Sequence, residues 1–148
     1  MNKFPPPPYA IFAMINVRRY LAEIDNLGNA AHEEAAQYAL MSRATLDRRL
    51  RMCQTAFREL VTAERVRRVH NYFVRFPHAT ADDLAQQAGY AHGSTLTQSF
   101  YDLFGTTMTE YRKGLLRDEK RRYRERRTAR STEQKTMSDK TQGSHEIR

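Results

Sequence analysis

Short polar side chains gather at the start of one predicted helix in the second half of the sequence. In GYAHGSTLTQSFYDLFG, residues 89 to 105, apolar residues recur at helical spacing, and the opposite face is polar and nearly uncharged. Such side chains place hydrogen-bond donors and acceptors close to the helix. A glutamine in this position can pair with adenine in the major groove of DNA, and a threonine methyl can contact a thymine methyl. The residues with this chemistry are Ser94, Thr95, Thr97 and Gln98.

A second group of candidates lies on an earlier predicted helix, RATLDRRLRMC, residues 43 to 53. Four arginines oppose one aspartate there, which leaves a net charge of +3. Arg48 could bind the O6 and N7 atoms of guanine, which is the commonest base-specific contact in the major groove. Asp47 could accept a hydrogen bond from a cytosine amino group, or it could only orient a neighbouring arginine.

Further residues are candidates for contacts with phosphates, which set the register of a protein on DNA. At the start of the later helix, Gly93 leaves space for a phosphate to meet free backbone N–H groups. A solvated surface charge is an equal alternative for Arg18, Arg19, Arg58, Arg112 and Lys113, and Arg112 could also be a structural residue of the seventh helix. The basic candidates are Arg43, Arg49, Arg51, Arg58, Arg112 and Lys113, together with Arg18 and Arg19.

Apolar residues at helical spacing predict seven helices and no strand, so we expect an all-α fold. Asn29, Ser42 and Thr80 are of the type that caps helix N-termini. Gly89 should end the fifth helix, and Thr107 should open a capping box for the seventh. The predicted helices are 10–24, 30–41, 43–53, 57–76, 81–88, one within 89–105, and 108–116.

The sequence contains an internal repeat, since residues 35–50 and 84–100 both follow the pattern of helix, short turn and helix. Ala36 of the first copy matches Ala85, a small residue where two helices cross closely. Leu46 and Leu50 match Leu96 and Phe100 on the core side of the second helix, and the turn is one residue longer in the second copy. We therefore expect two helix-turn-helix subdomains joined by a long linker helix.

These motifs resemble the DNA-binding domain of the AraC/XylS family, over residues 10–116. The first helix-turn-helix carries the pattern S-x-x-x-L-x-R. The sequence differs from the family at three places: QTAF (54–57) lacks the usual loop glycine, Met108 replaces proline and Ala81 replaces isoleucine. The matching residues are Ser42, Leu46 and Arg48 in the first copy, and Ala85, Gly89, Tyr90, Phe100, Phe104, Gly105, Thr107, Tyr111 and Arg112 in the second.

The resemblance implies a bacterial, cytoplasmic transcription regulator that binds double-stranded promoter DNA as a monomer, and it favours an activator that contacts RNA polymerase. In this family Ala44, Asp47 and Arg48 occupy base-reading positions. Few residues precede the first helix, so we expect no effector-binding domain and no small-molecule effector. We also expect no enzymatic activity, no cofactor and no metal, because no catalytic or metal-binding motif is present.

The composition agrees with an anionic partner, since the 148 residues carry a formal net charge of +8 and a pI near 9.9. Residues 1–9 form a proline-rich lead-in, residues 10–116 the DNA-binding domain and residues 117–148 a tail. Residues 117–130 carry +5 and residues 131–148 carry no net charge. We expect this tail to be a fraying helix and then mostly disordered.

Other features limit the alternatives. Cys53 is the only cysteine, so no internal disulfide can form, and YAIFAMI (9–15) is too short to span a membrane. One alternative remains a non-specific or RNA-binding protein that acts through residues 117–130. Another is a protein-interaction module whose polar helix faces a partner.

Overall fold

The computed structural model describes residues 4–142, with side chains up to residue 138. Within this part of the chain every regular element is a helix, so the predicted all-α class is confirmed. The elements are α1 (Pro8–Glu23), the 3-10 helix η1 (Leu27–Asn29), α2 (His32–Tyr38), α3 (Arg43–Met52), α4 (Phe57–Arg75), α5 (Ala81–Ala88), α6 (Gly93–Phe104) and α7 (Met108–Gln142).

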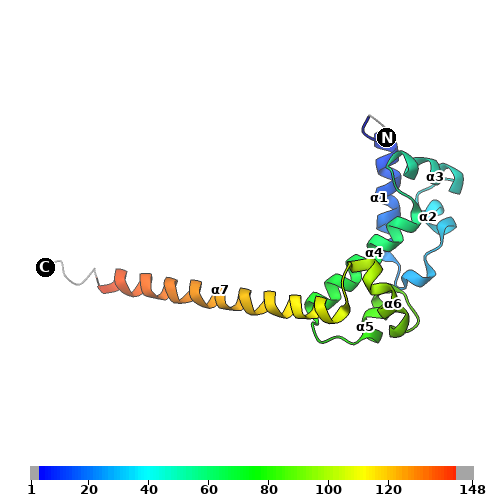
Figure 1. The fold of residues 1–148 in the computed structure, drawn as a ribbon. Coiled ribbons are helices and arrows are strands. Elements are labelled where there is room, and N and C mark those ends of the chain that lie inside the picture. Colours follow the sequence, from blue (N-terminus) through cyan, green and yellow to red (C-terminus); the bar gives the residue numbers. More distant parts are fainter. Residues whose placement is uncertain (1–3, 143–148) are drawn as a thin grey trace. The chain divides into compact units, whose positions relative to one another are not determined.

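The chain forms two units, Met1–Met108 and Thr109–Arg148, and each is described by itself. In the first unit, α2 and α3 make one helix-turn-helix and α5 and α6 make the other. Helix α4 runs between them, as the first unit in Figure 1 shows. The linker helix that the repeat predicts is therefore present.

The first helix-turn-helix packs on α1. Ala36 is 2% exposed on α2, and Leu46 and Leu50 are 0% and 1% exposed on α3, where they meet Val17 and Leu21 of α1 in one buried cluster. Burying an aliphatic side chain of this size contributes about 1.5–3 kcal/mol. The core side of α3 is therefore fixed, and its opposite side must face solvent.

The second helix-turn-helix repeats this arrangement on α4. Ala85 and Leu96 are 1% and 0% exposed, and Phe100 is buried like Phe73 of α4. The Thr80 hydroxyl accepts a hydrogen bond from the Asp83 N–H, and the Asp83 carboxylate accepts one from the Thr80 N–H. Hydrogen bonds from the hydroxyl and N–H of Thr80 lower the pKa of Asp83. The predicted cap of α5 is confirmed.

Each turn begins with a residue in the left-handed region. This residue is Leu40 with a φ of 55° in the first copy and Gly89 with a φ of 73° in the second. The next helix is capped by Ser42 in the first copy and follows His92 in the second. The interval is two residues in one case and three in the other, so the predicted one-residue difference between the turns is confirmed.

Replacing Leu40 with glycine should raise the free energy of unfolding by about 0.5–1 kcal/mol. The left-handed conformation costs an L-residue about 1–2 kcal/mol, and glycine removes this cost. Part of the stabilisation is offset because glycine also makes the unfolded chain more flexible. Leu40 is 93% exposed, so little burial is lost. Urea unfolding would measure the change. Leu40→Ala keeps the Cβ atom and should show no gain; equal effects of the two substitutions would contradict backbone strain at this position.

The 3-10 helix η1 touches the turn of the second helix-turn-helix through two glycines. A Cβ atom on Gly89 would lie 2.3 Å from the Gly28 nitrogen, and one on Gly28 would lie 2.7 Å from the Gly89 oxygen. Only residues without a side chain allow this approach. The backbone that follows α1 is therefore in direct contact with the second helix-turn-helix.

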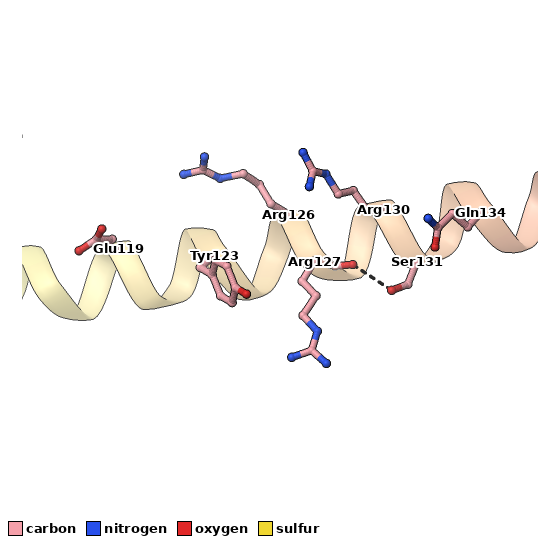
Figure 2. A pocket seen from close by; sticks show the side chains of 7 residues that line it. All are labelled: Glu119, Tyr123, Arg126, Arg127, Arg130, Ser131 and Gln134. Carbon is pink, nitrogen blue, oxygen red and sulfur yellow. Dashed lines mark hydrogen bonds between the residues drawn. The ribbon is translucent and has the colours of Figure 1, made fainter.

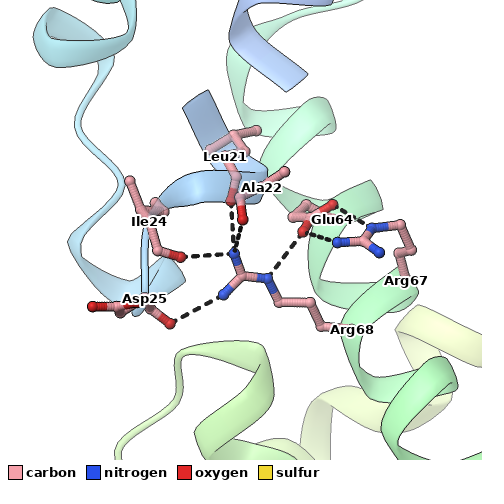
Figure 3. Close-up of polar contacts among 7 residues, drawn as sticks. All are labelled: Leu21, Ala22, Ile24, Asp25, Glu64, Arg67 and Arg68. Atoms are coloured by element: carbon pink, nitrogen blue, oxygen red, sulfur yellow. Dashed lines mark hydrogen bonds and ion pairs between the residues drawn. The ribbon is translucent and has the colours of Figure 1, made fainter. Parts of the chain in front are cut away.

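Arg68 of α4 holds the end of α1 (Figure 3). Its guanidinium donates hydrogen bonds to the carbonyl oxygens of Leu21 and Ile24 at 2.7 Å and of Asp25 at 3.0 Å, and its Nε donates to the Glu64 carboxylate at 2.9 Å. These carbonyls lie at or just beyond the end of a helix, where partial negative charge collects. Arg68 therefore caps α1 and fixes it to α4.

Glu64 receives hydrogen bonds from two arginines, since Arg67 binds the same carboxylate at 2.6 and 2.7 Å. Burial raises the pKa of Glu64, but the hydrogen bonds and charges of Arg67 and Arg68 together outweigh burial and leave it below its ordinary 4.5. Only 10% of the Glu64 side chain and 15% of the Arg68 side chain are exposed. Glu64 therefore remains charged and balances Arg68.

The prediction that Asn29 caps the second helix is wrong. Asn29 ends η1, which forms because the Asn26 side chain accepts a hydrogen bond from the Gly28 N–H at 2.8 Å. Helix α2 starts later, and the N–H of Ala31 before it donates to the Tyr20 hydroxyl at 3.2 Å. The hydroxyl of Tyr20 thus binds the N-cap residue itself, and no side chain caps the first turn of α2.

The ends of the chain also differ from expectation. Helix α1 begins at Pro8 rather than residue 10, because proline is tolerated in the first turn of a helix. Helix α7 does not end near residue 116 but continues to Gln142, so residues 117–142 are helical where a fraying helix followed by disorder was expected. The predicted tail residues 143–148 lie outside the described part. No helix among the described residues has the length and apolar character to cross a membrane.

Candidate nucleic-acid interface

The outer side of α3 carries three exposed residues that share one face. Ala44, Arg48 and Arg51 follow each other at intervals of four and three residues, opposite the buried Leu46 and Leu50. Neither Arg48 nor Arg51 makes a hydrogen bond or an ion pair with the side chains described. Both guanidinium groups are therefore available for an external acceptor, and Arg51 belongs to the same face as Arg48.

Asp47 points to α2 instead. Its Oδ1 lies 2.9 Å from Nε2 of His32, and the His32 ring stacks on Phe57 with centroids 4.6 Å apart. The Asp47 side chain is 38% exposed, so it is accessible but has a partner within the protein. The expectation that Asp47 orients a neighbouring arginine does not match this geometry, because the side chain beside Asp47 is that of His32.

Arg43 and Arg49 also have partners in the first unit. Arg43 forms an exposed ion pair with Glu33 of α2. The pKa of the Glu33 carboxyl is lowered by a hydrogen bond from the backbone N–H of Glu33 and by the contact with Arg43. The guanidinium of Arg49 lies over the Tyr9 ring of α1 at 5.4 Å from its centroid. A guanidinium has five N–H donors, so neither contact excludes a phosphate.

Helix α6 presents the polar face that its sequence predicts. Ser94, Thr95 and Gln98 are exposed and have no hydrogen-bond partner among the described side chains. The Thr97 hydroxyl donates to the Gly93 carbonyl oxygen at 2.9 Å, so mainly its methyl group is left for an external contact. Small hydrogen-bonding groups near the start of the helix can approach base edges closely.

Gly93 has a packing role rather than the expected contact with phosphate. Its N–H donates to Oδ1 of Asp82 at 2.6 Å, and the residue is buried. A Cβ atom would lie 2.7 Å from the carbonyl carbon of Ala81 and from the nitrogen of Asp82. Gly93 therefore lets the start of α6 lie against the start of α5, and its N–H is no longer free for an anion.

Comparison with known proteins identifies the family. A model of the helix-turn-helix domain matches residues 35–114, which is more than half of the 148 residues. The chain belongs to the AraC-type helix-turn-helix family. It is a DNA-binding transcriptional regulator. No curated protein matches the sequence.

Three solved structures of regulators are similar to the chain in fold. A DNA-binding transcriptional dual regulator from Escherichia coli K-12 has a TM-score of 0.61 and 21% identity over 71% of this chain and 93% of that one. The C-terminal domain of AraT, a response regulator from Geobacillus stearothermophilus, has a TM-score of 0.60 and 18% identity over 75% and 88%. The transcriptional regulator CdpR from Pseudomonas aeruginosa has a TM-score of 0.54 and 23% identity over 73% and 32%.

The places where the sequence departs from the AraC-type pattern have local consequences. Where the loop before α4 lacks its glycine, Gln54 takes the left-handed conformation with a φ of 55°. Met108, in place of proline, brings its sulfur to 3.7 Å from the Thr97 hydroxyl. Ala81 remains at the first position of α5 behind the Thr80 cap. All the AraC-type helices are present despite these changes.

Two aromatic residues near the AraC-type interface were not among the predicted site residues. Tyr101 is 63% exposed and lies three residues after Gln98, so helical spacing alone could have included it in the polar face of α6. The ring of Tyr90 lies under the guanidinium of Arg65, at 4.9 Å from its centroid. This contact joins α4 to the turn before α6, and no local pattern signals it.

The other predicted phosphate contacts lie on different elements. Arg58 is exposed in the first turn of α4, and Arg18 and Arg19 are exposed on α1. Arg112 and Lys113 lie on α7 in the second unit, with Arg112 partly buried and Lys113 exposed. Exposure makes these side chains accessible to phosphates, and their contacts with DNA remain predictions.

Proposed function

We propose that this regulator reads a specific site in double-stranded DNA by placing α3 and α6 in successive segments of the major groove. The observation that carries the proposal is the pair of exposed faces with unpartnered side chains. These are Arg48 and Arg51 on α3 and Ser94, Thr95 and Gln98 on α6. A surface that only had to be soluble would not need small neutral groups at the start of α6.

The length of α4 supports a contact of both helices with one side of the duplex. Its 19 residues span about 28 Å at about 1.5 Å per residue, which is close to the ~34 Å that one turn of B-DNA spans. One chain supplies both recognition helices, so a monomer suffices and the DNA site need not be palindromic. Bending the DNA to meet both helices would cost about 1–6 kcal/mol.

The proposed contacts follow from the chemistry of each exposed side chain. Arg48 would bind guanine and Gln98 adenine, with the threonine methyl groups against thymine. Asp47 remains a weaker candidate because of His32, and Gly93 is left out. The proposed base contacts are Ala44, Arg48, Ser94, Thr95, Thr97 and Gln98, and the proposed phosphate contacts are Arg43, Arg49, Arg51, Arg58, Arg112 and Lys113.

Replacing Arg48 or Gln98 with alanine should weaken binding to a selected duplex about tenfold or more and leave binding to random duplex within about twofold. One lost bidentate contact removes about 1–3 kcal/mol of discrimination between bases. The selected duplex would come from a random-sequence pool enriched on the wild-type protein. Titration of labelled duplexes at constant salt gives both affinities, since the salt concentration sets the phosphate contribution.

Two exposed residues away from both faces provide matched controls. Gln86→Ala on α5 and Arg75→Ala at the end of α4 remove the same groups and should change neither affinity beyond about twofold. Equal losses on selected and random duplex for Arg48→Ala and Gln98→Ala would contradict base reading. If the wild-type protein gave no enriched sequence and any duplex displaced the bound one, the alternative of a non-specific nucleic-acid-binding protein would hold.

A further inference from the structure

We infer that one face of α7 is an additional, sequence-independent contact surface for the phosphates of duplex DNA. We call it the basic face. The inference rests on the proposed function, because α7 gains from a duplex that the first unit already holds. The basic face consists of Lys113, Arg117, Lys120, Arg121, Arg124 and Arg127.

The spacing of these residues places them along one side of the helix. Counted from Lys113, the other five follow after 4, 7, 8, 11 and 14 residues. With 3.6 residues per turn, these intervals return to the same side. The carboxylates of this segment, Asp118, Glu119 and Glu125, fall at other intervals. The face therefore has a cation at nearly every turn and no anion between them. The composition gives the net charge of this segment, and the spacing shows that the charge lies on one side of the helix.

Figure 2 shows how arginines divide between the sides of α7. Arg127, a member of the basic face, points to the opposite side of the helix from Arg126 and Arg130. Arg122 falls between Asp118 and Glu125, which lie four residues before it and three after it. Arg122, outside the basic face, thus has carboxylates at neighbouring helical positions. Within the basic face only Lys113, three residues after Glu110, and Arg121 do.

The basic face has the exposure and length for several phosphates. All six side chains are exposed, and of these Arg121 has acidic partners, Asp118 at 3.2 Å and Glu125 at 3.9 Å. The face extends over 14 residue intervals, about 21 Å at about 1.5 Å each. Duplex DNA carries one phosphate charge per ~1.7 Å of axis, so such a face can neutralise several of them. Arginine also binds phosphate with two parallel hydrogen bonds.

Duplex DNA is the polyanion we expect at the basic face, because α7 is covalently attached to a DNA-binding domain. Helix α7 starts at Met108, directly after the second helix-turn-helix. Once the first unit binds a duplex, the effective concentration of phosphates around a tethered segment reaches the millimolar range, where weak contacts count. Because phosphates carry no sequence information, the basic face raises affinity for selected and random duplex alike.

The test compares two double variants of the full chain that each remove two arginine charges from α7. Arg117→Gln with Arg124→Gln alters the basic face, and Arg122→Gln with Arg126→Gln alters the other sides. Glutamine keeps a helix propensity close to that of arginine, and circular dichroism would verify equal helicity. Duplex affinity is then measured from 50 to 200 mM salt for selected and random duplex.

The basic-face variant should lose about tenfold in affinity for both duplexes, and the slope of log affinity against log salt should fall by about two. The control variant should lose less than about threefold. Equal losses for the two variants would overturn the inference, because bulk charge alone would explain them. A loss confined to single-stranded RNA, measured with a labelled random RNA, would overturn it in favour of an RNA contact. Failure of the proposed function would appear separately, as absent discrimination between selected and random duplex by the wild-type protein.

Discussion

Gly93→Ala should lower the free energy of unfolding by about 3 kcal/mol, which is the upper end for an extra methyl group in a well-packed region. The new Cβ atom would lie 2.6–2.7 Å from Oδ1 and N of Asp82 and from the carbonyl carbon of Ala81. Two of these atoms belong to the backbone of α5, so relief requires α6 to move away from α5. Movement would also break the hydrogen bond from Gly93 to Asp82.

Urea unfolding measures this loss, and duplex titration under native conditions measures the effect of a displaced α6 on binding. Gly114→Ala is the matched control, since a Cβ atom there meets no atom within 4 Å. Alanine in a helix interior should stabilise by about 0.5–1 kcal/mol relative to glycine. If Gly93→Ala unfolded at the same urea concentration as the wild-type protein, the close packing of α5 and α6 would not be a source of stability.

Arg68→Met should cost about 3–5 kcal/mol, the range for removing one partner of a buried ion pair. Methionine keeps much of the aliphatic stem but leaves the carbonyls of Leu21, Ile24 and Asp25 without their donor and Glu64 without its closest buried cation. The loss should therefore come from uncompensated polar groups and little from packing. Urea unfolding of the full chain would measure it.

Arg67→Met is the matched control, because Arg67 binds the same carboxylate but its side chain is 54% exposed. An exposed ion pair contributes about 0–1 kcal/mol, so this variant should unfold close to the wild-type protein. Comparable losses for Arg67→Met and Arg68→Met would show that the cap on α1 adds nothing beyond the ion pair.

The ion pair of Glu64 and Arg68 should also affect how the stability of the protein depends on pH. The pKa of Glu64 is lowered in the folded protein, so its contribution to stability is complete above its ordinary value of 4.5 and is lost as the pH falls through the lower, folded value. Without Arg68 the pKa of Glu64 should rise toward its ordinary value. The Arg68→Met protein should therefore lose less stability between pH 6 and pH 3 than the wild-type protein does, and a steeper loss would contradict this account.

Local signals in the sequence predicted most of the helices. Ser42, Thr80 and Gly89 mark helix ends with groups that act within three or four residues of themselves, so their roles can be read directly from the chain. The cores of the two helix-turn-helix units followed from Leu46 and Leu96 at helical spacing. Family resemblance then indicated which sides of α3 and α6 to consider.

Contacts between distant segments account for what the sequence could not predict. Asn29 lost its expected role because it belongs to η1 and α2 starts only at His32. The N–H of Ala31, just before α2, binds the hydroxyl of Tyr20, eleven residues earlier. Asp47 turned out to face His32, fifteen residues earlier in the chain. Arg68 binds backbone oxygens, which no side-chain pattern reports. The length of α7 was also missed, because polar composition alone does not distinguish an isolated helix from disorder.

The double attachment between the two halves of the first unit has a consequence for target recognition. Arg68 fastens the end of α1 to α4, and Gly28 meets Gly89 backbone to backbone. If α3 and α6 bind DNA as proposed, helices on such a frame cannot adjust their separation independently, so the nucleic acid would have to adapt to the protein. Inserting one base pair between the DNA elements that α3 and α6 contact would weaken binding as much as changing the bases of one element. The protein would thus select its targets by the spacing between the two DNA sequence elements as well as by their base sequence.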